Sequence, residues 1–188
     1  MYSLEDFDKA KTKILKYIVY KRRTEQEVRE KFQNEFDEGM FEDIIDYLKD
    51  AKYIDDKEYI EKIVNNFMIL KNLSNKELKY KLIAKGLDKN LIEDYFYENR
   101  EELEEYEIKS ATNIILKKNR DMENDEIKMY LLKKGYKQSS INSAFEDIWF
   151  FILVNLYINL PYKKERENLW KEFYFLPIQW MLVELKQH

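Results

Sequence analysis

The sequence has no cysteine, one histidine at its last position, three glycines and two prolines in 188 residues. The lack of cysteine excludes disulfides, thiolate metal sites and cysteine nucleophiles. A lone terminal histidine excludes a Ser-His-Asp triad and a histidine-rich metal site. Because glycine and proline are so rare, we expect few β-turns and no glycine-rich phosphate-binding loop. We therefore expect a helical chain that is not an enzyme and holds no metal or cofactor.

Charge is high but nearly balanced, with 33 Lys and Arg against 37 Asp and Glu. A protein that coats nucleic acid unaided is usually basic, so this chain would need local basic patches or a protein partner. No signal peptide is visible. The longest apolar run, residues 148–160, is shorter than the roughly 20 residues that cross a membrane. We expect a cytoplasmic protein that does not enter the membrane.

A segment that begins at Ser74 recurs at Glu123 with a constant offset of 49 residues. A third copy begins at Thr24, where Glu35-Phe36 replaces Lys85-Gly86, so either its turn differs or the match is looser there. Recurrence at this period is typical of repeat proteins. The matched pairs are Glu77 and Glu126, Leu78 and Ile127, Leu82 and Leu131, Gly86 and Gly135, Leu87 and Tyr136, Ile92 and Ile141, and Phe96 and Phe145.

Each copy predicts three helices: a longer first helix, a short second one and a third that buries residues such as Ile92 and Phe96. Apolar residues three and four positions apart indicate one buried face on each first helix. These stripes are Phe7, Ala10, Ile14 and Ile18 in the first copy, Tyr59, Ile60, Ile63, Val64 and Phe67 in the second, and Leu103, Ala111, Ile114 and Ile115 in the third.

The second helices carry start and stop signals. Thr24-x-x-Glu27 and Ser74-x-x-Glu77 have the form of capping boxes. In the third copy Glu123 stands at the matching position, so we expect Asp121 or Asn124 to cap that helix instead. Gly86 and Gly135 suit the left-handed residue that follows a helix.

The repeats divide the chain into residues 1–53, 54–101 and 102–147, followed by an apolar, aromatic tail, 148–188, which we expect to be helical. A unit of this size is near the lower limit for independent folding, so neighbouring units should share apolar surface. The predicted fold is all-α, with tandem three-helix repeats stacked into an elongated, curved array.

Four segments in order resemble the RecX family, the regulatory proteins of the RecA recombinase. The resemblance covers about residues 8–147, although Ala51-Lys52 stands where the family usually has glycine just before the aromatic residue. The four segments are Lys21-Arg22-Arg23-Thr24-Glu25-Gln26-Glu27-Val28, Leu48-x-x-Ala51-Lys52-Tyr53-Ile54-Asp55-Asp56, Ser74-x-x-Glu77-Leu78-x-x-Lys81-Leu82-x-x-Lys85-Gly86 and Met129-x-Leu131-Leu132-x-x-Gly135-Tyr136.

The resemblance implies a regulator of homologous recombination and the SOS response. Such a protein would bind the RecA filament, meet single-stranded DNA through it, and inhibit its extension, ATP hydrolysis and strand exchange. A monomer is expected, with a tail-mediated dimer as an alternative. The alternative function is a stand-alone helical nucleic-acid-binding protein, although the predicted third helices are acidic, which disfavours insertion into a DNA groove.

Three basic clusters are candidates for binding the partner or DNA. The first carries six cations and no acid between Ala10 and Thr24, and we hypothesise that all three share one face. Solvation of helix faces is the alternative for any single lysine. The candidates are Lys11, Lys13, Lys16, Lys21, Arg22 and Arg23, then Lys117, Lys118 and Arg120, then Lys128, Lys133, Lys134 and Lys137.

Two acidic features invite a metal or catalytic interpretation. The run from Glu98 to Glu107 is dense in glutamate, and Asp55 and Asp56 are adjacent. Carboxylates this dense are more often a solvated helix face, and we expect that here. We expect the aspartate pair to cap the helix that follows it.

The tail holds all three tryptophans, and residues 148–160 are apolar around the whole helix circumference. Such a surface must be buried or must bind something. Three possibilities stay open: two extra helices split at Pro161, a dimer interface, or an extension foreign to the protein. Burial against the third repeat is favoured, because exposure would promote aggregation.

Overall fold

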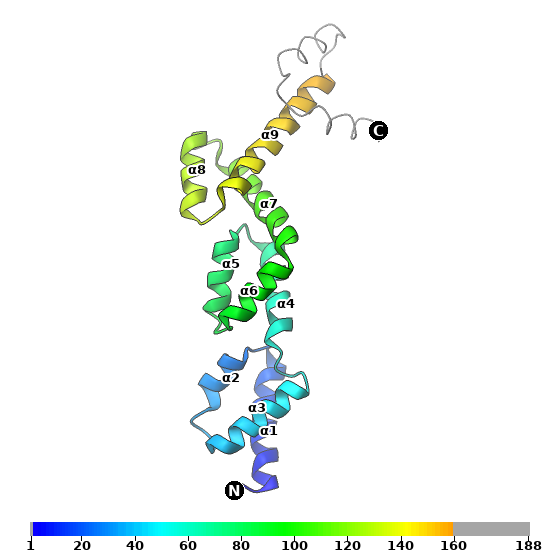
Figure 1. Cartoon of the computed structure of the whole chain (residues 1–188), viewed down its shortest axis with the longest axis vertical. Coiled ribbons are helices and arrows are strands. Elements are labelled where there is room, and N and C mark those ends of the chain that lie inside the picture. The colour runs from blue at the N-terminus through cyan, green and yellow to red at the C-terminus, as the bar shows by residue number, and fades with distance from the viewer. Residues whose placement is uncertain (1, 160–188) are drawn as a thin grey trace. The chain divides into compact units, whose positions relative to one another are not determined.

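The computed structural model describes residues 2–159, and every regular element in that range is an α-helix (Figure 1). The all-α prediction is therefore confirmed. The helices are α1 (Leu4–Tyr20), α2 (Glu25–Phe32), α3 (Glu38–Asp50), α4 (Asp56–Leu70), α5 (Asn75–Ile83), α6 (Lys89–Glu98), α7 (Arg100–Lys118), α8 (Asn124–Lys133) and α9 (Gln138–Asn159).

Helices α1, α2 and α3 enclose one apolar cluster, which we call the core of repeat 1. Its centre includes Ile14, Val28 and Ile44, each fully buried. A second cluster lies between α4, α5 and α6 and includes Ile60 and Leu78. The apolar stripes predicted from the sequence supply both clusters. Burial of these faces is the main force that holds short helices in place.

The first helix of repeat 3 also covers repeat 2. Leu103 and Tyr106 of α7 belong to the core of the second repeat, and α7 packs against α5, α6 and α8. Further along α7, Ile114 and Ile115 are buried, as are Ile127 and Leu131 of α8 and Ile141 of α9. A single long helix therefore serves two neighbouring repeats, which is the sharing of apolar surface expected of a repeat protein.

Side-chain caps begin most of the helices. Thr24 and Ser74 form capping boxes with Glu27 and Glu77, as predicted. Asp55 accepts a hydrogen bond from the Glu58 backbone N–H and so caps α4, also as predicted. For α8, the second helix of repeat 3, the expected cap was Asp121 or Asn124, and this prediction was wrong. Glu123 itself is the N-cap of α8, because Glu126 reaches back and accepts from its backbone N–H at 3.1 Å.

Two glycines end the second helices in left-handed backbone, with φ of +74° at Gly86 and +87° at Gly135. The turn after α2 contains no residue with positive φ, so it differs from the turns at Gly86 and Gly135. Lys52 is the one non-glycine residue with positive φ in residues 2–159, at +60°. It occupies the place where the RecX-like pattern has glycine.

The chain divides into two compact units, residues 1–144 and 145–188, and α9 contributes to both. In the second unit Trp149 and Phe151 are 58% and 69% exposed, in contrast to the burial expected for this stretch. The expected break at Pro161 and the rest of the tail lie outside the described residues. Within the described part, no helix is both long and apolar enough to cross a membrane.

Candidate functional site: repeat junctions and basic residues

The junction between repeats 1 and 2, here the first junction, is built around the start of α2. The Thr24 hydroxyl donates a hydrogen bond to the Lys85 carbonyl oxygen at 2.9 Å. The Glu25 backbone N–H donates to Asp56 Oδ1 at 3.0 Å, and Lys85 Nζ lies 3.1 Å from Glu27 Oε1. The helix start of one repeat thus satisfies a carbonyl near the helix end of the next.

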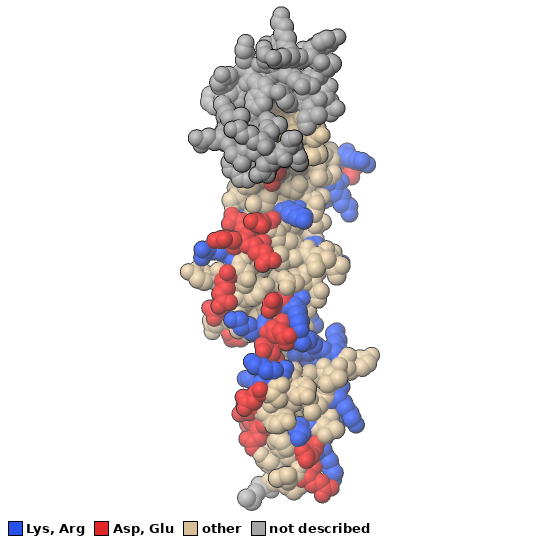
Figure 2. Space-filling model, turned by 90° about the vertical axis from the view of Figure 1, so that its right-hand side faces the viewer, with Lys and Arg blue, Asp and Glu red and all other residues tan. Residues whose placement is uncertain are grey.

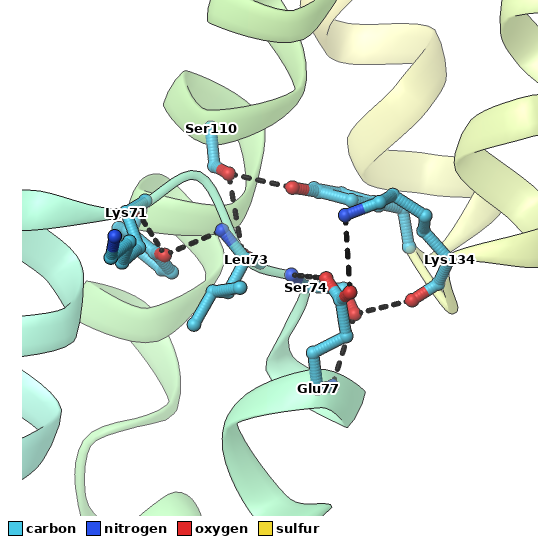
Figure 3. A network of polar contacts seen from close by, with 8 residues as sticks. Lys71, Leu73, Ser74, Glu77, Ser110 and Lys134 are labelled. Atoms are coloured by element: carbon cyan, nitrogen blue, oxygen red, sulfur yellow. Dashed lines mark hydrogen bonds and ion pairs between the residues drawn. The ribbon is translucent and has the colours of Figure 1, made fainter. Parts of the chain in front are cut away.

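The second junction, between repeats 2 and 3, repeats this arrangement (Figure 3). The Ser74 hydroxyl donates to the Lys134 carbonyl at 2.7 Å. The Asn75 backbone N–H donates to Glu107 Oε1 at 2.8 Å, and Lys134 Nζ lies 3.1 Å from Glu77 Oε1. Each contact of the first junction therefore has its counterpart here.

In the two junctions, the two carboxylate oxygens of the capping-box glutamate have different hydrogen-bond partners. In Glu27 and Glu77, Oε2 accepts from the N-cap backbone N–H, while Oε1 pairs with the lysine of the next repeat. The pKa of Lys85 is raised by its hydrogen bond to Glu27. One side chain therefore both starts a helix and joins two repeats. Net contributions of about 0.5–1.5 kcal/mol per hydrogen bond are typical of such contacts.

The glycine of each junction is required by space as well as by backbone angle. A Cβ on Gly86 would lie 2.4 Å from Cγ of Gln26, and one on Gly135 would lie 2.8 Å from Cδ of Lys76. These distances are far inside van der Waals contact. The glycines thus let the second helices of successive repeats approach closely.

The acidic run is exposed at Glu101, Glu102, Glu104 and Glu105, as expected of a solvated helix face, but Glu107 is an exception. Its side chain is fully buried. One oxygen accepts from Asn75, and the other accepts from the Ser140 hydroxyl at 2.7 Å and the Lys137 backbone N–H at 3.4 Å. The carboxylate therefore lies between the first turns of α5 and α9, where helix N-termini favour negative charge. Periodicity did not reveal this residue, since its partners are about thirty residues away.

Buried hydroxyl groups complete the second junction. The Tyr106 hydroxyl donates to the Lys71 carbonyl at 2.9 Å and accepts from the Leu73 backbone N–H at 3.0 Å. The Ser110 hydroxyl donates to the Leu73 carbonyl at 3.3 Å (Figure 3). It also forms a hydrogen bond with the Tyr136 hydroxyl at 2.7 Å. Burial raises the pKa of both tyrosines, so they stay neutral donors. The loop before α5 is thereby fixed to α7.

The first basic cluster is not free of acids once folded, which corrects the expectation of six uncompensated charges. The helix surface and neighbouring helices bring carboxylates to four of its members. Lys11 pairs with Asp8 at 2.6 Å, Lys13 with Glu35, Arg22 with Glu58 at 2.5 Å, and Arg23 with Glu27 at 4.0 Å. Arg23 also lies over the Tyr17 ring, 4.5 Å from its centroid.

The Arg22–Glu58 pair joins repeat 1 to α4 on the exposed surface. Hydrogen bonds from Arg22 and Lys62 lower the pKa of the Glu58 carboxyl to about 2. Two cations are thus engaged by one carboxylate. Such exposed pairs are worth little in stability, but they fix where the side chains lie.

The other two clusters are mixed. Lys128 pairs with Asp125 at 3.1 Å and Lys134 with Glu77, while Lys118 lies 4.3 Å from the centroid of the Tyr130 ring. The remaining candidates form no ion pair with the described residues. The candidates without an ion pair are therefore Lys16, Lys21, Lys117, Lys118, Arg120, Lys133 and Lys137.

Lys71 was missed by the sequence reasoning. It is the C-cap of α4, is exposed, and forms no ion pair with the described residues. Lys21 is the C-cap of α1, and Lys117 and Lys118 end α7. Cations therefore recur where each first helix ends, a place where the helix dipole favours them. The signal was available in the 50-residue spacing of Lys21 and Lys71.

Figure 2 shows how these charges lie on one face of the molecule. Lys and Arg are interspersed with Asp and Glu, and no continuous basic area covers this face. Within residues 2–159, no group of three acidic or histidine side chains is placed to hold a metal ion. A surface of separate cations on a helical scaffold suits contact with a large partner.

Matched junctions and a long helix shared by neighbouring repeats define an all-α helical-repeat protein. No family model matches the sequence. Individual relatives do match. The chain is 34% identical over 140 residues to "Regulatory protein RecX" of Staphylococcus carnosus, covering 72% of this chain and 52% of that protein. It is 30% identical over 154 residues to the protein of the same name from Clostridium acetobutylicum, covering 74% and 69%.

Solved structures agree with these relatives. The crystal structure of RecX from Lactobacillus salivarius superposes with a TM-score of 0.68 at 25% identity, covering 79% of this chain and 99% of that one. The chain belongs to the RecX family, which confirms the resemblance drawn from the four segments. The matches span roughly half to two thirds of the length of these curated relatives.

Proposed function

We propose that this protein regulates homologous recombination and the SOS response by binding the RecA–single-stranded DNA filament. In this proposal it inhibits filament extension, ATP hydrolysis and strand exchange by occupying the filament and catalyses no reaction itself. The observation that carries the proposal is the pair of matched junctions, because they hold repeats in equivalent surroundings, as a partner with repeated subunits requires. Membership of the RecX family supports it.

The exposed cations give this scaffold its charge contacts. Lys16, Lys21, Lys117 and Arg120 form no ion pair with described residues, so they can bind phosphates or carboxylates without losing an existing partner. Lys11, Lys13 and Arg22 would first have to leave theirs. We therefore assign the stronger binding role to the first set. Several weak contacts on one scaffold add to a useful affinity.

The length and curvature of the repeat array, a monomeric state and contact with DNA through the filament belong to the same proposal. A concave stack of helices would lie across several subunits of a filament and obstruct the addition of the next one. The stand-alone nucleic-acid-binding alternative is distinguished by the affinity for DNA in the absence of recombinase.

The test measures RecA ATP hydrolysis on single-stranded DNA in the presence of stoichiometric amounts of the protein. The wild type should slow hydrolysis. A variant with Lys16, Lys21 and Lys117 changed to glutamine should need several-fold more protein for the same effect. The matched control changes Lys11, Lys13 and Arg22 to glutamine and should be affected less. An unchanged rate and filament length with the wild type would refute the proposed function.

A further inference from the structure

The last two residues of α1 and of α4 are apolar side chains that lie in solvent. Val19 and Tyr20 are 72% and 89% exposed, and Ile69 and Leu70 are 80% and 71% exposed. The two pairs are 50 residues apart and end equivalent helices of repeats 1 and 2. Neither pair contributes to the cores of these repeats. Four side chains exposed to this degree at matched positions call for a binding explanation.

The surroundings of the two pairs also match. The last turns of α1 and α4 contain no basic residue, although cations are favoured there. Each pair is followed directly by an exposed lysine C-cap, Lys21 or Lys71, that forms no ion pair with the described residues. Repeats 1 and 2 therefore display the same short element, two apolar residues and a lysine. We call these the helix-end elements. In repeat 3 the equivalent helix ends in Lys117 and Lys118 instead.

The chemistry of the helix-end elements favours a protein surface over nucleic acid. Three of the four apolar residues are aliphatic, and aliphatic side chains cannot stack on bases as aromatic rings do. They suit an apolar hollow, and the adjacent lysine suits a carboxylate at the rim of that hollow. Because the element occurs twice on one chain, its best match is a partner that presents one surface at regular intervals.

We propose that the two helix-end elements bind equivalent apolar sites with an acidic rim on successive protein subunits of the partner polymer. This inference rests on the proposed function, for which the polymer is the recombinase filament. It assigns to Val19, Tyr20, Ile69 and Leu70 the contacts with filament protein. Two linked contacts of this kind multiply their effect on affinity.

The experiment uses the full chain and measures its Kd for a RecA filament formed on single-stranded DNA with a non-hydrolysable ATP analogue. One variant carries Val19→Ser and Tyr20→Ser, a second carries Ile69→Ser and Leu70→Ser, and a third combines all four changes. The control carries Leu4→Ser and Tyr97→Ser, which are 85% and 73% exposed but lie elsewhere. Helicity and Tm should stay unchanged, because none of these residues is buried.

Each two-residue variant should bind about tenfold more weakly and the combined variant about a hundredfold, while the control stays within about twofold. A swap variant, Val19→Ile with Tyr20→Leu, places the repeat 2 pair in repeat 1 and should bind like the wild type. Wild-type affinity in the combined variant, or an equal loss in the control, would overturn this inference alone.

Three other outcomes would also contradict the inference. If the variants lose affinity for bare single-stranded DNA to the same extent, the elements bind nucleic acid and the inference is wrong. If the wild type is a dimer and the combined variant a monomer by light scattering, a second copy of this chain covers them, and the inference is again wrong. If the wild type does not bind the filament, the proposed function fails and this inference fails with it.

Discussion

At the scale of single residues, Lys52 has the backbone conformation that glycine adopts most easily. Its φ is +60°, and left-handed backbone costs a residue with a Cβ about 1–2 kcal/mol. The sequence showed a lysine where RecX-like junctions have glycine, but it did not show whether the turn would keep its shape. The structure shows that the turn is left-handed at Lys52 and that the Tyr53 and Ile54 backbone N–H groups both bond the Leu48 carbonyl.

We therefore predict that Lys52→Gly raises the free energy of unfolding by about 0.5–1 kcal/mol, after the extra chain entropy of glycine is subtracted. Urea denaturation measures this change. Lys52→Ala is the control: it removes the same exposed ion pair with Asp55 but retains the Cβ. Equal stability of the glycine and alanine variants would show that the turn is not strained.

Gly86 presents the opposite case, in which the glycine is present and necessary. Gly86→Ala should lower the free energy of unfolding by about 2 kcal/mol or more, since it adds both left-handed strain and a clash with Gln26. Gly39→Ala, inside the first turn of α3 where space is available, should be neutral or stabilising by up to about 1 kcal/mol. Thermal and urea unfolding compare the two, and a similar loss in both would contradict the packing argument.

At the scale of helices, the sequence predicted the elements better than the contacts between them. Apolar spacing and Thr or Ser followed by Glu three residues later predicted where α2 and α5 begin, because both signals are local. The same Thr24 and Ser74 hydroxyls also bond carbonyls about sixty residues away, and no local pattern reports such a contact. For the same reason, the acids that pair with Lys13 and Arg22 were invisible in the sequence.

Substitution of Glu107 tests how much the second junction contributes to the stability of the protein. Glu107→Gln keeps the shape but places an amide N–H₂ where the carboxylate accepts from Ser140 or Lys137. We predict a loss of about 1–3 kcal/mol in the free energy of unfolding. Glu104→Gln, an exposed position on the same helix, should change it by less than about 0.5 kcal/mol. Equal effects of the two substitutions, measured by urea denaturation, would show that the buried carboxylate does not join the repeats.

At the scale of the whole molecule, the repeat offset predicted the three-helix plan, and the resemblance of four segments in order predicted the family. The basic residues show where such reasoning stops. Charges counted along the sequence suggested a cluster of six free cations, whereas folding pairs Lys11, Lys13, Arg22 and Arg23 with acids. The cations that remain lie mainly at or near helix ends, where equivalent positions of the repeats place them. The proposed binding surface therefore depends on the repeat and its junctions more than on local composition.

The measurement that tests the central claim most directly compares the affinity of the wild-type protein for three ligands: the RecA–single-stranded DNA filament, bare single-stranded DNA and RecA without DNA. If a repeat scaffold binds a polymer of identical subunits, the filament should bind at least about tenfold more tightly than either component, because only the filament offers several sites at once. Equal affinity for bare DNA and for the filament would contradict the account.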